Sequence, residues 1–117
     1  MPKTERSAVQ QELSALRKSI SQMAKEVPEL NQSFTDLLGV CIEDGALSCN
    51  VKELVALGAG VAVHCPPCIL LHTQKCVQLG LSRQEIIEAA YIGVTMGGGP
   101  AYTHMRYVFE ALDDAGA

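Results

Sequence analysis

The spacing of apolar side chains constrains the fold most, because it is helical along most of the chain. The first segment sets the pattern, with apolar residues at alternating intervals of four and three: Val9, Leu13, Leu16, Ile20, Met23 and Val27. This spacing places the side chains on one narrow face of an α-helix. Such a face suits a partner helix in another subunit, and it suits ordinary core packing equally well.

Breaks and caps divide the rest of the chain into further helices. The expected segments run from Leu30 to near Gly45, from Asn50 to Val63, from Pro66 to about Leu79, from Ser82 to Gly97, and onward from Pro100. Asn50 with Glu53, and Ser82 with Glu85, have the spacing of capping boxes. No segment shows the sustained alternation of a strand. We therefore predict an all-α, single-domain fold of about six helices.

Length and charge limit what such a chain can do. The 117 residues fit one domain, in which we expect residues 1–46 to serve core or oligomer packing and residues 47–115 to carry the chemistry. A hydrophobic content of 48% is high for a small monomer, which favours a homo-oligomer. The net charge is −4 with no basic cluster, so nucleic-acid binding is not expected.

The cellular compartment is predicted from the lack of a membrane-spanning stretch and of an apolar signal core. No apolar stretch is long enough to span a membrane, and the polar start from Met1 to Arg6 has no apolar signal core. We therefore predict a cytoplasmic protein without a membrane partner. In the cytoplasm its five cysteines are better explained as reduced thiols, a metal site or a redox site than as structural disulfides.

The stretch from His64 to His72 carries the strongest chemical signal. Cys65 and Cys68 lie three residues apart at a helix start, close enough for a small-ring disulfide. Unpaired amides and the helix dipole at such a start stabilise a thiolate, the reactive form of cysteine. His72 follows Cys68 by four residues, so both share a helix face and the imidazole can exchange a proton. Redox use is the favoured interpretation.

Glu53 is the candidate third member of the site. If the helix that contains Glu53 and the helix after Cys65 fold back antiparallel, the rise per residue brings Glu53 level with His72. The carboxylate could then orient the imidazole, as in activated thiols generally. As alternatives, Glu53 could be only a helix cap and His72 a packed core histidine.

Other polar residues give weaker signals. Cys76 is expected to pack, Cys41 and Cys49 to be buried or half-buried thiols, and His104 could line a pocket from a neighbouring helix or subunit. The Gly97–Gly99 run is expected to be a helix-breaking turn, because no phosphate-loop pattern accompanies it. Zinc is a further alternative for the cysteine pair. It would need a fourth ligand beside Cys65, Cys68 and His72, from His64 or Cys49.

Glu53, Cys65, Cys68 and His72 together match the Glu-x11-Cys-x2-Cys-x3-His signature of alkylhydroperoxidase D and the related carboxymuconolactone decarboxylase family. The similarity covers roughly residues 47–112, including the Gly80 stop and the turn before Pro100. The resemblance implies an all-helical homo-oligomer, often a trimer or hexamer. It also implies peroxide reduction through a cysteine disulfide, with Glu and His relaying protons. Pro67 departs from the pattern, since alkylhydroperoxidase D carries a histidine there.

The predicted function is therefore that of a thiol-dependent peroxidase or disulfide oxidoreductase with peroxiredoxin activity. Its site is Cys65, Cys68, His72 and Glu53, and Cys68 is the favoured attacking thiol. The partners are a hydroperoxide substrate and an external thiol or dithiol reductant, and no cofactor is expected. Two alternatives remain, a cofactor-free lactone decarboxylase and a zinc-binding structural module.

Overall fold

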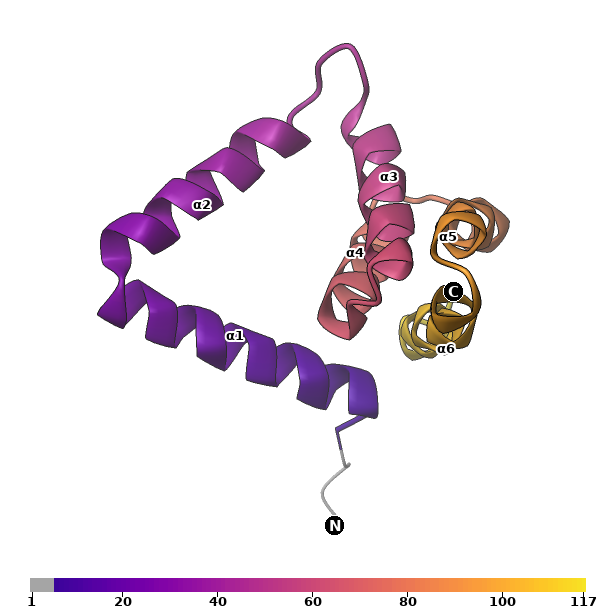
Figure 1. Cartoon of the computed structure of the whole chain (residues 1–117), viewed down its shortest axis with the longest axis horizontal. Coiled ribbons are helices and arrows are strands. Elements are labelled where there is room, and N and C mark those ends of the chain that lie inside the picture. Colours follow the sequence, from indigo (N-terminus) through magenta and orange to yellow (C-terminus); the bar gives the residue numbers. More distant parts are fainter. Residues whose placement is uncertain (1–5) are drawn as a thin grey trace. The chain divides into compact units, whose positions relative to one another are not determined.

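The computed structural model describes residues 6–117, and in this part of the chain it contains six α-helices and no strand (Figure 1). The helices are α1 (Ala8–Glu26), α2 (Pro28–Ile42), α3 (Cys49–Ala62), α4 (Pro66–Gln78), α5 (Arg83–Gly97) and α6 (Gly99–Asp114). The predicted all-α class is confirmed. Residues 1–5, most of the polar start used in predicting the compartment, lie outside the described part. None of the helices described is long and apolar enough to cross a membrane.

The chain divides into two compact units, Met1–Cys49 and Asn50–Ala117. The predicted division after residue 46, and its assignment to a single structural domain, stay predictions. In the first unit α1 and α2 meet at Val27, which leaves the helical conformation because Pro28 follows it. Ser7 begins α1 with a capping box to Gln10. The second helix, α2, buries none of its own residues.

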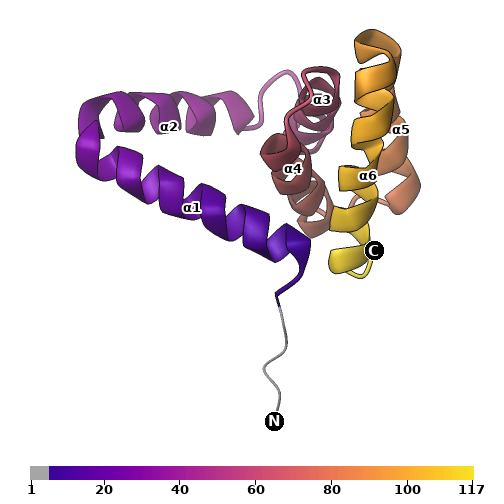
Figure 2. The same cartoon turned by 60° about the horizontal axis from the view of Figure 1, so that its bottom comes forward.

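The second unit packs four helices around one core. Fully buried aliphatic side chains come from every helix of the unit: Leu57 and Val61 on α3, Ile69 on α4, Ile86 on α5, and Val108 and Leu112 on α6. α6 contacts both α4 and α5 (Figure 2). Burial of such side chains stabilises this unit by roughly 1.5–3 kcal/mol each.

Caps fix the helix boundaries close to where the sequence predicts them. Ser82 accepts from the Glu85 amide, and Glu85 accepts from the Ser82 amide, so the predicted capping box is present. The pKa of Glu85 lies below its ordinary value, first because of its hydrogen bond with the Ser82 backbone and second because of that with the Ser82 side chain. Gly98 ends α5 with a φ of 74°, the left-handed conformation that glycine adopts without strain. α3 begins at Cys49, one residue before the predicted start at Asn50.

Small residues let α3 and α5 approach until their backbones touch. A Cβ added at Gly93 would lie close to the Gly58 carbonyl oxygen and 2.8 Å from the Val61 Cβ. A Cβ at Gly58 would lie 3.0 Å from the Ala89 carbonyl oxygen. The crossing is therefore fixed by backbone contact, and this contact sets the course of α3, which carries Glu53.

Candidate functional site

The two cysteines of the motif form a disulfide at the start of α4. Cys65 is the N-cap residue and Cys68 lies in the first turn, with 5.3 Å between their Cα atoms. This separation lies in the normal range for disulfides. Both residues are half-buried, so the sulfurs lie near the surface. The structure thus brings the predicted pair together.

The helix start supplies fewer amide donors than the motif alone suggests. Pro66 and Pro67 occupy the first two helical positions, and proline has no N–H. The Ile69 amide is also engaged, because it donates to the Cys65 carbonyl at 2.9 Å. The expectation that unpaired amides stabilise the Cys65 thiolate is therefore wrong for these two positions.

Glu53 and His72 form a direct hydrogen-bonded pair between α3 and α4. The Nδ1 of His72 lies 2.6 Å from Oε2 of Glu53. Because a carboxylate oxygen accepts, Nδ1 carries the proton and the lone pair of the neutral ring is on Nε2. The Glu53 side chain is only 3% exposed, whereas that of His72 is 24% exposed. Burial of a carboxylate is costly without such a partner.

This geometry agrees with the expectation that Glu53 comes level with His72. Buried positions on α3 follow the helical repeat from Glu53 through Leu57 to Gly60 and Val61, so Glu53 lies on the inward face. A capping role at the surface does not require such burial. The cysteine pair, the imidazole and the carboxylate are thus carried by two consecutive helices and the residue between them, and the carboxylate holds one tautomer of the ring.

A second group of rings begins one residue before Cys65, and no sequence pattern revealed it as a group. His64 precedes Cys65, and its ring centroid lies 5.3 Å from that of His104 on α6. The row continues to Tyr107, 5.5 Å from His104, and to Arg106, whose guanidinium lies 4.3 Å from the Tyr107 ring centre. For His104 a place in a pocket wall was one interpretation of the sequence, and the structure shows its contact with His64.

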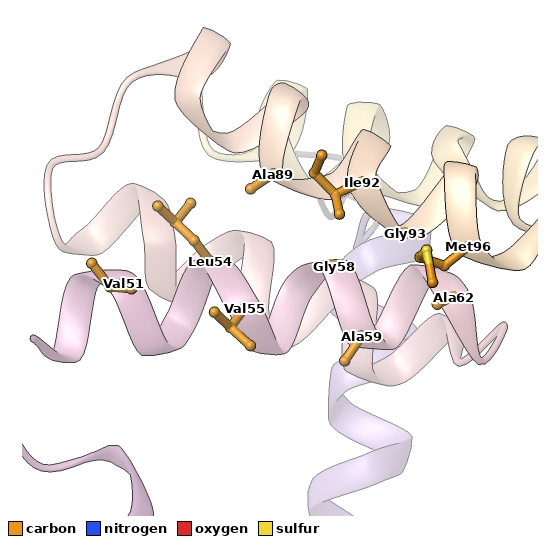
Figure 3. Close-up of a pocket in the computed structure, with 10 residues that line it drawn as sticks. All are labelled: Val51, Leu54, Val55, Gly58, Ala59, Ala62, Ala89, Ile92, Gly93 and Met96. Carbon is orange, nitrogen blue, oxygen red and sulfur yellow. The ribbon is translucent and has the colours of Figure 1, made fainter. Parts of the chain in front are cut away.

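An apolar groove lies between α3 and α5, with a volume of about 380 Å³ (Figure 3). Its wall consists of aliphatic, sulfur-containing and small residues: Val51, Leu54, Val55, Gly58, Ala59, Ala62, Ala89, Ile92, Gly93 and Met96. Ile92 and Met96 are 64% and 79% exposed, so the groove opens to the surface. No sequence pattern predicts this groove, because α4 separates the two helices along the chain.

The remaining cysteines, Cys41, Cys49 and Cys76, form no disulfide within residues 6–117. Cys76 is buried, as expected from its packing role, and Cys49 is half-buried. Cys41 is exposed, so the expectation of a buried or half-buried thiol is wrong there; it lies on α2, which buries none of its residues. Across residues 6–117 no three His, Cys, Asp or Glu side chains are grouped to hold a metal. The ligand set imagined for zinc is therefore not assembled.

The comparison with known proteins decides the family. The model of the carboxymuconolactone decarboxylase family matches residues 28–111. The chain belongs to this family. The match includes the cysteine motif and both members of the Glu53–His72 pair, and it extends into α2.

Solved structures of carboxymuconolactone decarboxylase family proteins share the fold. One from Legionella pneumophila is 34% identical, with coverage of 91% of this chain and 95% of that one and a TM-score of 0.85. One from Thermotoga maritima is 28% identical, covers 89% of each chain and has a TM-score of 0.79; it is described with a suggested part in an antioxidative response. An uncharacterised protein of Cupriavidus necator is 28% identical over 86% of both chains.

Proposed function

We propose that this protein is a thiol-dependent peroxidase that reduces hydroperoxides through the Cys65–Cys68 pair. The observation that carries the proposal is the disulfide at the start of α4, together with the carboxylate-held His72 one turn beyond Cys68. Membership of the family, and the antioxidative response suggested for the Thermotoga maritima relative, support it. The proposal includes a cytoplasmic location, where reduced thiols such as Cys76 persist.

The proposed cycle has two half-reactions. The Cys68 thiolate attacks one peroxide oxygen, the O–O bond breaks, and the departing alkoxide takes a proton to leave as an alcohol. Cys68 is now a sulfenic acid, and Cys65 attacks its sulfur, which forms the disulfide and releases water. An external thiol or dithiol then reduces the disulfide. His72 moves protons near Cys68, and Glu53 holds the imidazole in one tautomer.

Peroxide treatment of the reduced protein should remove two thiols per chain. The expected modification is confined to Cys65 and Cys68, because only these sulfurs lie within bonding distance in the described residues. Thiol titration with peptide mapping measures it, and Cys41, Cys49 and Cys76 provide internal controls. Recovery of both Cys65 and Cys68 as free thiols after peroxide would exclude the proposed function.

His72 and Glu53 should act as one unit on Cys68. Replacing His72 by Ala is expected to slow alkylation of Cys68 at neutral pH, because the proton acceptor is lost. Replacing Glu53 by Gln should slow it less, since the imidazole remains while losing its orienting charge. The double variant should slow alkylation of Cys68 by less than the two single effects combined, as expected for groups in one network. Alkylation kinetics measure this, and a Glu53→Gln variant with an unchanged rate would reduce Glu53 to a structural role.

We also propose a homo-oligomer, a trimer or hexamer. On α2 the apolar side chains Leu30, Phe34 and Leu37 are 72%, 59% and 62% exposed. A second apolar surface is the groove between α3 and α5. Surfaces of this kind on soluble chains mark association sites.

Replacing Phe34 by Lys should therefore lower the mass of the assembly, because a charge would have to be buried in the contact. Light scattering at micromolar concentration measures the mass against the 12.5 kDa chain. Gln32→Lys is the matched control, since Gln32 lies on the opposite side of α2 and contacts Asp36. A monomeric wild-type protein would contradict the proposal.

A further inference from the structure

We propose that His64 and His104 form a histidine pair that promotes ionisation of Cys65, separate from the Glu53–His72 pair that serves Cys68. This inference rests on the proposed function and deepens it, because it assigns a proton acceptor to the second thiol of the redox pair. Cys68 then has the imidazole of His72 on α4. Cys65 has the imidazoles of His64, in the α3–α4 connection, and of His104 on α6.

The first argument is the backbone of His64. Its φ is 59°, a left-handed conformation, and no other non-glycine residue within 6–117 has a positive φ. The chain turns here because the His64 amide donates to the Val61 carbonyl and the Cys65 amide to the Gly60 carbonyl. This pattern closes a helix end at which glycine is the usual residue. A histidine that accepts strain where glycine would fit without it points to a use for its side chain.

The second argument is the ring contact with His104. The His104 Nδ1 donates to the Pro100 carbonyl at 2.7 Å, so the lone pair of the neutral ring is on Nε2. His64 is exposed and His104 half-buried, so water and protons reach the pair. Unlike His72, His104 is hydrogen-bonded to a backbone carbonyl and has no carboxylate partner among residues 6–117.

The charged side chains next to the histidine pair on α6 pair with each other. Beyond His104 lie the Tyr107 hydroxyl and the Arg106 guanidinium, which donates to that hydroxyl at 2.9 Å. Arg106 also pairs with Glu110 at 2.8 Å, which offsets its charge and leaves the two imidazoles as the proton acceptors of this row. On the α4 side the first-turn groups are Cys65, two prolines and Cys68.

The third argument is the shortage of amide donors at the helix start. Pro66 and Pro67 remove two N–H groups that would otherwise face a thiolate at the N-cap. Cys65 also makes no side-chain capping hydrogen bond. A cation beside the thiol compensates for this loss, because a nearby His⁺ stabilises a thiolate.

The step balances as follows. The Cys65 thiol transfers its proton to the histidine pair, which gives a thiolate and an imidazolium. The thiolate attacks the Cys68 sulfenic sulfur, the S–S bond forms and the S–O bond breaks. The hydroxide that leaves takes the imidazolium proton and departs as water. The oxidant is the hydroperoxide of the proposed function, and no further reactant is needed.

The test compares the two thiols in variants that each keep only one cysteine of the Cys65–Cys68 pair. Cys68→Ser leaves Cys65 as the site thiol, and Cys65→Ser leaves Cys68. Into each background we would introduce His64→Asn, which tolerates the left-handed backbone, or His104→Asn, which keeps a donor for the Pro100 carbonyl. Alkylation by iodoacetamide is followed from pH 6 to pH 10 (a span about the ordinary thiol pKa of roughly 8.5), with peptide mapping to assign the site.

The expected result is a slower alkylation of Cys65, about three- to tenfold at neutral pH, with little effect on Cys68. The loss should vanish at high pH, because the thiol then ionises without help. His72→Asn should have the opposite effect, slowing alkylation of Cys68 more than alkylation of Cys65. Equal effects on the two thiols, or a loss that is the same at every pH, would overturn the proposal.

A second variant separates this role from a structural one. His64→Gly removes the imidazole and relieves the strained backbone, so it should raise the melting temperature while still slowing Cys65. If His64→Gly raises the melting temperature but leaves the alkylation rate of Cys65 unchanged, the proposal is also overturned. The proposed function is tested separately, since these rates need no peroxide. Failure of peroxide to oxidise the wild-type pair would exclude peroxidase activity and leave the alkylation result readable.

Discussion

Replacing Cys68 by Ser should reduce hydroperoxide turnover by at least about a hundredfold, because the attacking thiolate is lost. Replacing Cys65 by Ser should abolish turnover as well, but by a different route. Cys68 can still be oxidised once, and its sulfenic acid then has no partner with which to form the disulfide. Turnover with an excess of dithiol measures the loss, and a sulfenic-acid trap followed by peptide mapping identifies the oxidised residue.

The two serine variants also decide which thiol attacks. Trapped sulfenic acid on Cys68 in the Cys65→Ser protein, and none on Cys65 in the Cys68→Ser protein, is the expected outcome. The opposite distribution would make Cys65 the attacking thiol. Cys41→Ser is the matched control, since Cys41 is an exposed thiol on α2, and its turnover should equal that of the wild type. Full turnover in either motif variant would contradict the proposed cycle.

Replacing Gly93 by Ala should destabilise the protein by about 3 kcal/mol, near the upper end for overpacked sites. The new methyl would meet the Gly58 carbonyl oxygen and come within 3.1 Å of the Ala62 amide nitrogen, and backbone atoms cannot turn away as a side chain can. α5 would have to move off α3, with loss of core packing along both helices. Chemical denaturation gives the change in unfolding free energy.

Gly39→Ala is the matched control for this prediction. Gly39 lies inside α2 with no atom within 4 Å of the position of a new Cβ, so alanine should stabilise the helix by roughly 0.5–1 kcal/mol. The two substitutions add the same methyl group in helices of similar length, so their opposite signs isolate the close contact. Equal stability of the two variants would show that α3 and α5 do not cross as closely as described.

Much of the fold could be predicted because its signals are local. The capping box from Ser82 to Glu85, the stop at Gly80 and the break at Pro28 depend on residues a few positions apart. The cysteine pair is equally local, since three residues at a helix start place two sulfurs within bonding distance. The place of Glu53 could be predicted for a related reason. Two consecutive helices with a short connection fold back on each other, and the rise per residue sets which positions meet.

Features that join distant segments could not be predicted in this way. The His64–His104 contact spans α4 and α5 along the sequence, and no periodicity relates the two rings. The groove between α3 and α5 arises from glycines whose role is visible only once the crossing is known. The exposure of Cys41 was also missed, because an apolar helix face gives no sign of whether its own chain covers it.

The sequence by itself therefore determined the all-α class, the helix boundaries to within three residues, and the choice of Glu53, Cys65, Cys68 and His72 as candidate site residues. These follow from hydrogen bonds and side-chain spacing within one or two adjacent helices. Only the tertiary structure decided the 2.6 Å contact that selects the His72 tautomer, the close crossing of α3 and α5, and the second imidazole pair beside Cys65. The reason is physical: packing of helices far apart in sequence depends on the shapes of whole faces, and local patterns do not encode those shapes.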